Sequence, residues 1–320
     1  KHQIKRSIKE QIFLMKILVT GAAGFIGSHV FNELKSRKFN VYGIDNLSRG
    51  RLNNINNKKN FFKNDLNNNK TVKFFLKKHG PFKTIIHQAT LINENIEKED
   101  IHKDIRINIL STLNLIKNSY ELGTKKIIFA SSIAVYGKIK KKQVNELDNL
   151  SPLSSYAISK LTIENYIKYI SNFKFKNLKF VILRYSNVYG PKQSNLGEVG
   201  VIRKFIVDLK NNRSITKHGN GTQSRDFVYV KDVVEATIKS IKLDKNIILN
   251  ISSGKNTSVN QIINILKKIF KFQFRIKKKG FHKSEYFYFK ATNMLACKKL
   301  KWTPKTGIKS GILQTAQSNS

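Results

Sequence analysis

A tyrosine and a lysine four residues apart are the residues of this sequence best suited to acid–base chemistry. They are Tyr156 and Lys160, in the run YAISK. On a helix this spacing places both side chains on one face. A free tyrosine has a pKa of roughly 10, and a nearby ammonium stabilises the phenolate and lowers that pKa. Tyr156 could then remove a hydroxyl proton while a hydride leaves the same carbon. The competing interpretation is a surface Tyr–Lys pair.

A serine hydroxyl is expected beside this pair. Ser131 and Ser132 follow an apolar run at 126–130 that predicts a strand. Ligands of parallel sheets bind at the carboxyl ends of the strands, so Ser132 could share the proton of a substrate oxygen with Tyr156. A simple turn at the end of the strand is the alternative.

A glycine-rich loop, GAAGFIG at 21–27, lies between a predicted strand at 16–20 and a predicted helix at 25–37. Small residues there let backbone N–H groups approach a diphosphate at the helix N-terminus. The next strand ends at Asp45, whose carboxylate can accept hydrogen bonds from both ribose hydroxyls and would repel a 2′-phosphate. The pattern therefore favours NAD over NADP. Asp65 could contact the adenine amine, and a solvated loop aspartate is the alternative.

Strand-like and helical patterns alternate through the first half of the chain. Strands are predicted at 16–20, 40–44, 60–63, 84–87, 126–130 and 179–183, and helices at 25–37, 72–78, 105–122 and 156–171. This alternation predicts an α/β fold with a Rossmann-type, doubly wound parallel sheet. A helix at 201–210, a strand at 226–230 and a helix at 259–270 predict a smaller C-terminal α/β lobe. We expect an N-terminal extension at 1–14, an NAD-binding domain at 15–190 and a substrate-binding lobe at 191–320, with strands returning to the main sheet.

The composition is strongly basic. The chain contains sixty Lys and Arg and twenty Asp and Glu, which gives a net charge of +40. The basic residues are scattered in short runs, which indicates biased composition rather than a nucleic-acid site, and the positive field favours anionic ligands. One cysteine, Cys297, excludes an intrachain disulfide, and the histidine spacing predicts no metal site. No apolar stretch approaches the roughly 20 residues needed to span a membrane, so a cytoplasmic location is expected.

The ordered motifs resemble those of an extended short-chain dehydrogenase/reductase, specifically the NAD-dependent nucleotide-sugar epimerase/dehydratase family, over residues 15–302. The matching stretches are TGAAGFIG at 20–27, DNLS at 45–48, IIHQA at 85–89, ASSIAVYG at 130–137, SSYAISK at 154–160, LRYSNVYGP at 183–191, GNGTQSRDFVYVKDV at 219–233 and NISSG at 250–254.

The resemblance implies a role for each matching residue. Tyr156 would be the catalytic base, Lys160 its partner and Ser132 the third member, with Asn108 bracing the site. The substrate, a nucleotide-diphosphate sugar, would contact Ser132, Tyr156, Asn187, Arg225 and His282. The NAD contacts would come from Gly21, Gly24, Phe25, Ile26, Gly27, Asp45, Asn46, Asp65, Leu66, Gln88, Ala89, Asn108, Tyr156 and Lys160.

Two apolar residues, Ile133 and Ala134, occupy the positions after Ser132 at which dehydratase and decarboxylase relatives use extra acids. They cannot move protons, so the pattern is similar to UDP-glucose 4-epimerases, which oxidise C4 of a UDP-hexose to a ketone and return hydride to the opposite face. The segment Asn93–Glu97, with acidic Glu94 and Glu97, departs from relatives. So does His282-Lys283, which stands where a late arginine is common.

Three points stay open at this stage. One alternative is a nucleotide-sugar reductase or dehydrogenase with net hydride transfer, and another is a non-catalytic NAD- or RNA-binding member of the fold. The helices at 105–122 and 156–171 carry exposed-looking apolar residues. In relatives they pair as a homodimer, and packing within the chain's own core is the competing explanation.

Overall fold

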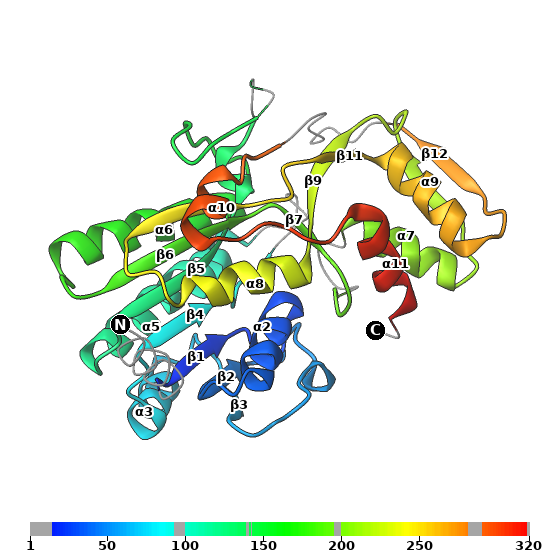
Figure 1. Ribbon diagram of the computed structural model, residues 1–320. Helices are drawn as coiled ribbons and strands as arrows, with labels where there is room; N and C mark the ends of the chain where they lie inside the picture. The colour runs from blue at the N-terminus through cyan, green and yellow to red at the C-terminus, as the bar shows by residue number, and fades with distance from the viewer. Residues whose placement is uncertain are drawn as a thin grey trace, which may run out of the picture.

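The computed structural model describes residues 15–92, 100–138, 141, 143–194, 200–280 and 290–318. A seven-stranded sheet forms its centre, in the order β10-β6-β5-β4-β1-β2-β3, and every pairing within it is parallel. Its strands are β1 (Ile17–Thr20), β2 (Val41–Asp45), β3 (Phe61–Lys63), β4 (Thr84–His87), β5 (Lys126–Ser132), β6 (Lys179–Tyr185) and β10 (Ile247–Ile251). The predicted Rossmann-type doubly wound sheet is confirmed (Figure 1).

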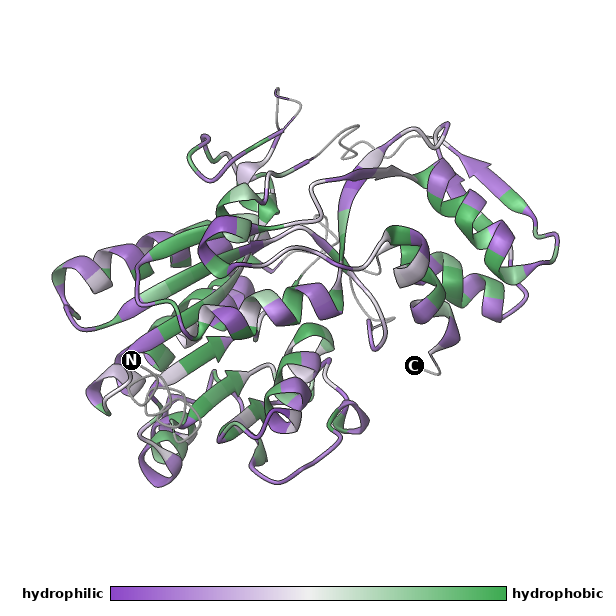
Figure 2. Ribbon diagram, viewed as in Figure 1, coloured by the Kyte–Doolittle hydropathy of each residue, from purple (hydrophilic) through white to green (hydrophobic). Residues whose placement is uncertain are grey.

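The strands carry apolar side chains on both faces of the sheet, so helices cover both faces. Ile17 and Val19 belong to one buried core, together with residues of α2 (Phe25–Ser36), α8 (Val230–Ser240) and α10 (Met294–Leu300). Leu18 belongs to the other core, with α3 (Asn69–His79), α5 (Ser111–Glu121) and α6 (Ser155–Phe173). Figure 2 shows the central strands as mostly apolar and the surrounding helices as mixed.

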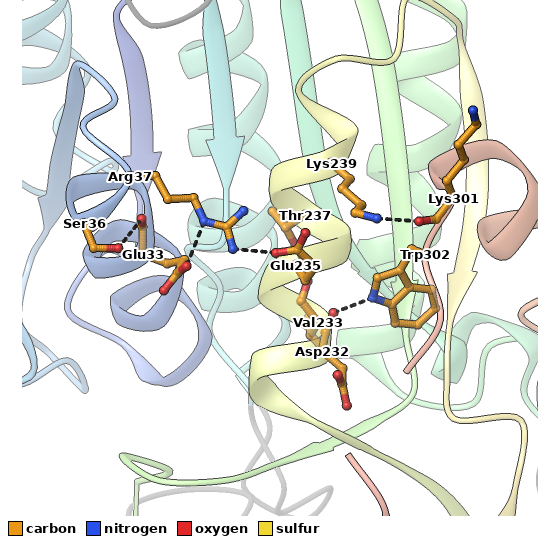
Figure 3. A network of polar contacts seen from close by, with 10 residues as sticks. All are labelled: Glu33, Ser36, Arg37, Asp232, Val233, Glu235, Thr237, Lys239, Lys301 and Trp302. Atoms are coloured by element: carbon orange, nitrogen blue, oxygen red, sulfur yellow. Dashed lines mark hydrogen bonds and ion pairs between the residues drawn. The ribbon is translucent and has the colours of Figure 1, made fainter. Parts of the chain in front are cut away.

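Polar contacts join α2, α8 and the chain after α10, which cover the face of the sheet that carries Ile17 and Val19. Arg37 of α2 forms an ion pair of 2.5 Å with Glu235 of α8. The indole N–H of Trp302 donates to the Asp232 carbonyl of α8 at 2.9 Å, and Lys239 donates to the Lys301 carbonyl. Figure 3 shows that α8 lies between α2 and the chain after α10 and contacts both.

A smaller group of elements follows β6 and gathers beyond one end of the large sheet (Figure 1). It contains a three-stranded sheet, β11-β9-β7, and a two-stranded sheet, β12-β8. Its elements are β7 (Asn187–Tyr189), α7 (Val201–Lys210), β8 (Ile215–His218), β9 (Ser224–Tyr229), β11 (Asn256–Ser258), α9 (Val259–Phe270), β12 (Ile276–Lys279) and α11 (Ile308–Gln317). Its helices share a third core. The predicted smaller α/β lobe is therefore present, and β10 returns from it to the main sheet.

The helix predicted at 105–122 differs from the structure. A short α4 (Ile101–Asp104) runs into a π-helical segment, η3 (Ile105–Leu110), before α5 begins. A π turn carries one extra residue and so changes which side chains face inward. Two short 3₁₀ turns, η1 (Leu52–Asn54) and η4 (Ile133–Tyr136), complete the elements.

Candidate functional site

The glycine loop joins β1 to α2 at the point where the strand order reverses, between β1 and β4. Gly21 has a φ of 64°, and a Cβ there would lie 2.7 Å from the Ala89 backbone nitrogen. A Cβ on Gly27 would lie 1.9 Å from the Gly21 carbonyl oxygen. Only glycine fits these two positions, and the tight turn that they allow places the first N–H groups of α2 at the carboxyl edge of the sheet. Such a turn suits the diphosphate of a dinucleotide.

Asp45 lies at the end of β2, directly beside this loop. Its carboxylate accepts a hydrogen bond from the Ala23 N–H at 3.0 Å and another from the Leu47 N–H at 2.7 Å. Burial raises the pKa of the Asp45 carboxyl, and the backbone hydrogen bonds act against that rise. Asp45 therefore braces the glycine loop, a role that the sequence did not reveal. Each carboxylate oxygen can still accept a further hydrogen bond from a ribose hydroxyl.

Three of the predicted NAD contacts, Asn46, Asp65 and Leu66, lie in the loops after β2 and β3. The Asn46 side chain accepts from the Ser48 N–H at 3.0 Å. The Asp65 carboxylate accepts from the Asn67 N–H at 2.9 Å, which orders its own turn, and Leu66 beside it is half-buried. One Asp65 oxygen is occupied by this turn, and a contact of Asp65 with adenine stays a prediction.

The Tyr156–Lys160 pair lies in the first turns of α6, which Ser154 caps by accepting the Ala157 N–H. The Lys160 ammonium lies 5.6 Å from the centroid of the Tyr156 ring and donates to the Ala130 carbonyl of β5 at 2.7 Å. Lys160 is only 4% exposed. Burial lowers its pKa to about 7, while the carboxylates of Asp104 and Glu164 act in the opposite direction.

Ser132 is the last residue of β5, two positions after the carbonyl that Lys160 contacts. Its hydroxyl oxygen accepts from the Ala134 N–H at 3.1 Å, which starts the 3₁₀ turn η4. The strand runs to Ser132 rather than to Ala130, so Ser131 and Ser132 belong to the sheet edge itself. Because Lys160 contacts β5, the structure brings the end of this strand to the start of α6.

Asn108, predicted to brace the site, holds the chain after β4 in place. Its side chain accepts from the Leu91 N–H at 2.7 Å and donates to the Leu91 carbonyl at 2.8 Å. Just before this segment, Gln88 donates to the Tyr185 hydroxyl at 3.0 Å, and the Ala89 N–H donates to Thr20. These bonds hold the chain after β4 against β6 and against the end of β1, next to the glycine loop.

The predicted substrate contacts lie on neighbouring strands of the smaller sheet. Asn187 is the first residue of β7 and donates to the Asp226 carbonyl of β9 at 3.3 Å. Arg225 of β9 donates to the Ser224 carbonyl at 3.0 Å. A contact of either residue with substrate stays a prediction. His282 and the segment Asn93–Glu97 lie outside the described residues.

A basic cavity of about 390 Å³ lies beside the start of α2. Its lining includes Arg49, Arg51, Lys192 and Arg203, together with Phe25 at the helix start. Four cations around one cavity favour an anionic ligand such as a phosphate group. The sequence analysis predicted Phe25 as a cofactor contact but missed these four cations, for which the excess of basic residues was the only signal.

A buried ion pair behind Ser132 was also missed. Arg184 of β6 and Glu164 of α6 lie 2.7 Å apart, with side chains 2% and 0% exposed. Glu164 also accepts from the Ser131 hydroxyl at 2.5 Å, and Arg184 donates to the Tyr136 hydroxyl at 2.9 Å. An arginine inside the apolar strand run at 179–185 was the available signal, because a buried charge requires a partner.

Within the described residues, no helix is long and apolar enough to cross a membrane. That part of the chain also contains no group of three or more His, Cys, Asp or Glu side chains arranged to hold a metal ion.

The parallel sheet, the glycine loop at its switch point and the Tyr156–Lys160 pair define an enzyme of the Rossmann type that uses a dinucleotide. Comparison with known proteins narrows this class. The model of the NAD dependent epimerase/dehydratase family matches residues 17–252, and the chain belongs to this family. The Rossmann site fits NAD, and NAD is the cofactor of this enzyme.

Three relatives illustrate the range of the family. A provisionally assigned UDP-glucose 4-epimerase of Methanocaldococcus jannaschii is 41% identical over 78% of this chain and 81% of its own length. A dTDP-4-dehydro-6-deoxyglucose reductase of Escherichia coli is 33% identical over 82% of this chain and 83% of its own. The UDP-glucose 4-epimerase of Thermotoga maritima, solved with UDP-glucose, has a TM-score of 0.89 and 32% identity. That comparison covers 95% of this chain and 98% of the other.

Proposed function

We propose that this protein is an NAD-dependent nucleotide-sugar 4-epimerase that interconverts the C4 epimers of a UDP-hexose through a transient 4-keto sugar. The observation that carries the proposal is the Lys160 ammonium held between the Ala130 carbonyl and the Tyr156 ring. This contact fixes a cation beside a phenol at the carboxyl edge of a dinucleotide-binding sheet. The similarity to two UDP-glucose 4-epimerases supports the choice of substrate.

The chain's own residues supply the proton chemistry. Tyr156, as the phenolate, removes the proton of the sugar 4-hydroxyl, and Lys160 stabilises the phenolate by its charge. The Ser132 oxygen already accepts from the Ala134 N–H, and its hydroxyl can donate to the sugar oxygen. NAD, when bound, would supply the hydride chemistry at C4. The glycine loop and Asp45 hold the dinucleotide on the sheet.

The residues after Ser132 favour epimerisation over elimination. Ile133 is 7% exposed and packs in a small apolar core with Val135, Tyr136 and Val144. Ile133 and Ala134 carry no group that can protonate a leaving hydroxyl, so the keto sugar keeps its substituents and takes the hydride back. Asn187, Arg225 and His282 are the proposed contacts of the nucleotide diphosphate, for which a guanidinium is well suited.

A nucleotide-sugar reductase is the second candidate, because a reductase is among the relatives. The two candidates differ in their hydride balance. An epimerase regenerates its NAD in each turnover, so the absorbance of reduced nicotinamide stays constant, whereas a reductase consumes NADH. A third class, an RNA-binding member of the fold, would show tight, salt-sensitive RNA binding that UDP-sugars do not compete for.

The deciding experiment incubates the purified protein with UDP-, dTDP- and GDP-hexoses and follows the sugar C4 configuration by NMR. Inversion at C4 of a UDP-hexose, absent from a Tyr156→Phe variant, supports the proposal. Stoichiometric NADH oxidation without inversion would replace it with the reductase.

We also propose that the protein forms a homodimer through α4, η3, α5 and α6. Several apolar side chains of these helices face solvent, among them Leu110 at 51%, Ile158 at 51%, Tyr169 at 48% and Phe173 at 70% exposed. Packing within the chain's own core does not account for these side chains. A second copy of the same surface would cover them.

A further inference from the structure

Asp104, at the end of α4, is a buried carboxylate to which the family resemblance gives no role. It is 2% exposed. One carboxylate oxygen accepts from the Asn108 side-chain amide at 2.6 Å, and the other accepts from the Ser159 hydroxyl. Burial of a carboxylate is costly, so its presence here calls for a compensating interaction.

The two hydrogen-bond partners of Asp104 belong to different elements, Asn108 to η3 and Ser159 to α6. Asn108 holds the Leu91 backbone through two hydrogen bonds, and Leu91 follows β4 near the glycine loop. Ser159 is the residue before Lys160 on α6. One carboxylate therefore ties the segment after β4 to the helix that carries Tyr156 and Lys160.

The titratable groups around Lys160 come from three elements. On α6 are Tyr156 and Glu164, and Glu164 is already neutralised by its ion pair with Arg184. On β4 is His87, which stays neutral because burial lowers its pKa to about 3. On α4 is Asp104, which accepts hydrogen bonds from a side-chain amide and a hydroxyl. Among the groups that oppose the effect of burial on the pKa of Lys160, Asp104 is the largest and Glu164 the second.

We propose that Asp104 is a positioning residue of the catalytic helix, whose negative charge keeps the Lys160 ammonium charged while its hydrogen bonds fix Asn108 and Ser159. The proposal rests on the proposed function, in which the charged form of Lys160 stabilises the Tyr156 phenolate. In this role Asp104 acts through Lys160.

The Asp104→Asn substitution separates charge from geometry. The amide oxygen can accept from Asn108, and the amide nitrogen can donate to Ser159, whose hydroxyl turns to accept. Loss of the negative charge disfavours the ammonium, so Lys160 loses its proton at lower pH, by on the order of one pH unit.

The first readout does not depend on activity. In purified protein carrying ¹³Cε-lysine, NMR follows the titration of Lys160, and its signal is assigned by its absence from a Lys160→Arg variant. An exposed lysine titrates near pH 10.4, well above the expected range of Lys160. A fall of its titration midpoint in Asp104→Asn supports the proposal, and an unchanged midpoint overturns it.

The second readout is the pH–rate profile of the enzyme with its substrate. In Asp104→Asn the alkaline limb of the profile should move to lower pH. For a fall of one unit in the pKa of Lys160, kcat on that limb should fall about tenfold, with little change in KM. A uniform loss of kcat without a shift of the alkaline limb would mean a purely structural role and would overturn the proposal.

Two variants serve as controls. Ser159→Ala removes a hydrogen bond but keeps the charge, and should leave the Lys160 midpoint in place. Asp232→Asn removes another buried carboxylate, which accepts from the Lys305 and Thr306 N–H groups on the α8 side, and should also leave it in place. A shift of the Lys160 midpoint without any sugar epimerisation would support the role of Asp104 and refute the proposed function instead.

Discussion

The Lys160 ammonium lies 5.6 Å from the centroid of the Tyr156 ring and is held there by the carbonyl of Ala130. The lysine therefore cannot move away from the phenol without leaving a buried donor unpaired. A cation fixed in this way lowers the cost of forming the phenolate.

Tyr156→Phe removes the proton acceptor and keeps the ring. We expect kcat to fall by roughly 10³-fold, the usual range for loss of a general base, while NAD binding is retained. Initial rates of C4 inversion measure the effect. Tyr166→Phe, on the exposed side of the same helix, is the matched control and should keep near-normal turnover. Near-full activity of Tyr156→Phe would refute the mechanism.

Asp45→Ala removes the hydrogen bond to Ala23 of the glycine loop, the hydrogen bond to Leu47 and the proposed ribose acceptor together. Hydrogen bonds to charged groups are worth about 1.5–3 kcal/mol each, so the Kd for NAD should rise by at least about tenfold. Titration of the variant with NAD, followed by calorimetry, measures this change. Asp208→Ala, which breaks a surface pair with Arg213, should not change the affinity. Equal NAD affinity for wild type and Asp45→Ala would contradict this assignment.

His87 should make the fold sensitive to acid. Its ring is buried between the hydroxyls of Thr20 and Thr112, and burial lowers its pKa to about 3. An unfolded histidine binds a proton near pH 6.5, so protonation favours the unfolded state. The stabilising contribution of neutral His87 is complete above about pH 6.5 and is lost towards pH 3, by about 1.4 kcal/mol per pH unit.

Urea unfolding at pH 7, 6 and 5 tests this prediction. The pH dependence of the unfolding free energy should be shallower in His87→Gln than in wild type. His102→Gln, at an exposed position, should retain the wild-type dependence. The same slope in all three proteins would show that His87 is not the group responsible.

Glu164→Gln should destabilise the protein, because it leaves the Arg184 guanidinium buried without its counter-charge. Breaking a buried ion pair in this way costs about 3–5 kcal/mol. The exposed pair of Glu33 and Arg37 provides the control, since Glu33→Gln should cost about 0–1 kcal/mol. Urea unfolding of both variants measures the two costs, and equal values would contradict the role of the buried pair.

Leu110→Glu should weaken the proposed dimer. Leu110 is 51% exposed in η3, and a charge there would be buried against the second copy. Light scattering after size exclusion should show a dimer for wild type and a larger monomer fraction for the variant. Leu147→Glu, at a position 95% exposed, should leave the dimer intact. A monomeric wild type at micromolar concentration would refute the interface.

The sequence alone predicted the sheet, the cofactor loop and the helices that carry the proposed chemistry. The predicted helices at 201–210 and 259–270 have the observed bounds. Apolar periodicity and glycine spacing are local signals, and a local signal suffices wherever neighbouring residues along the chain decide the backbone conformation. The Tyr156–Lys160 spacing is a signal of the same kind.

Only the tertiary structure revealed the partners of the charged groups. Asp45 and Ala23 are 22 positions apart, and Glu164 and Arg184 come from a helix and a strand. The π-helical segment at 105–110, which the sequence analysis read as ordinary helix, places Asn108 against Asp104 and Leu91. Contacts of this kind depend on how the sheet and helices pack, because a hydrogen bond requires two groups at a set distance whatever their separation along the chain. The sequence therefore determined which groups could do chemistry, and packing decided which of them are buried, paired and charged.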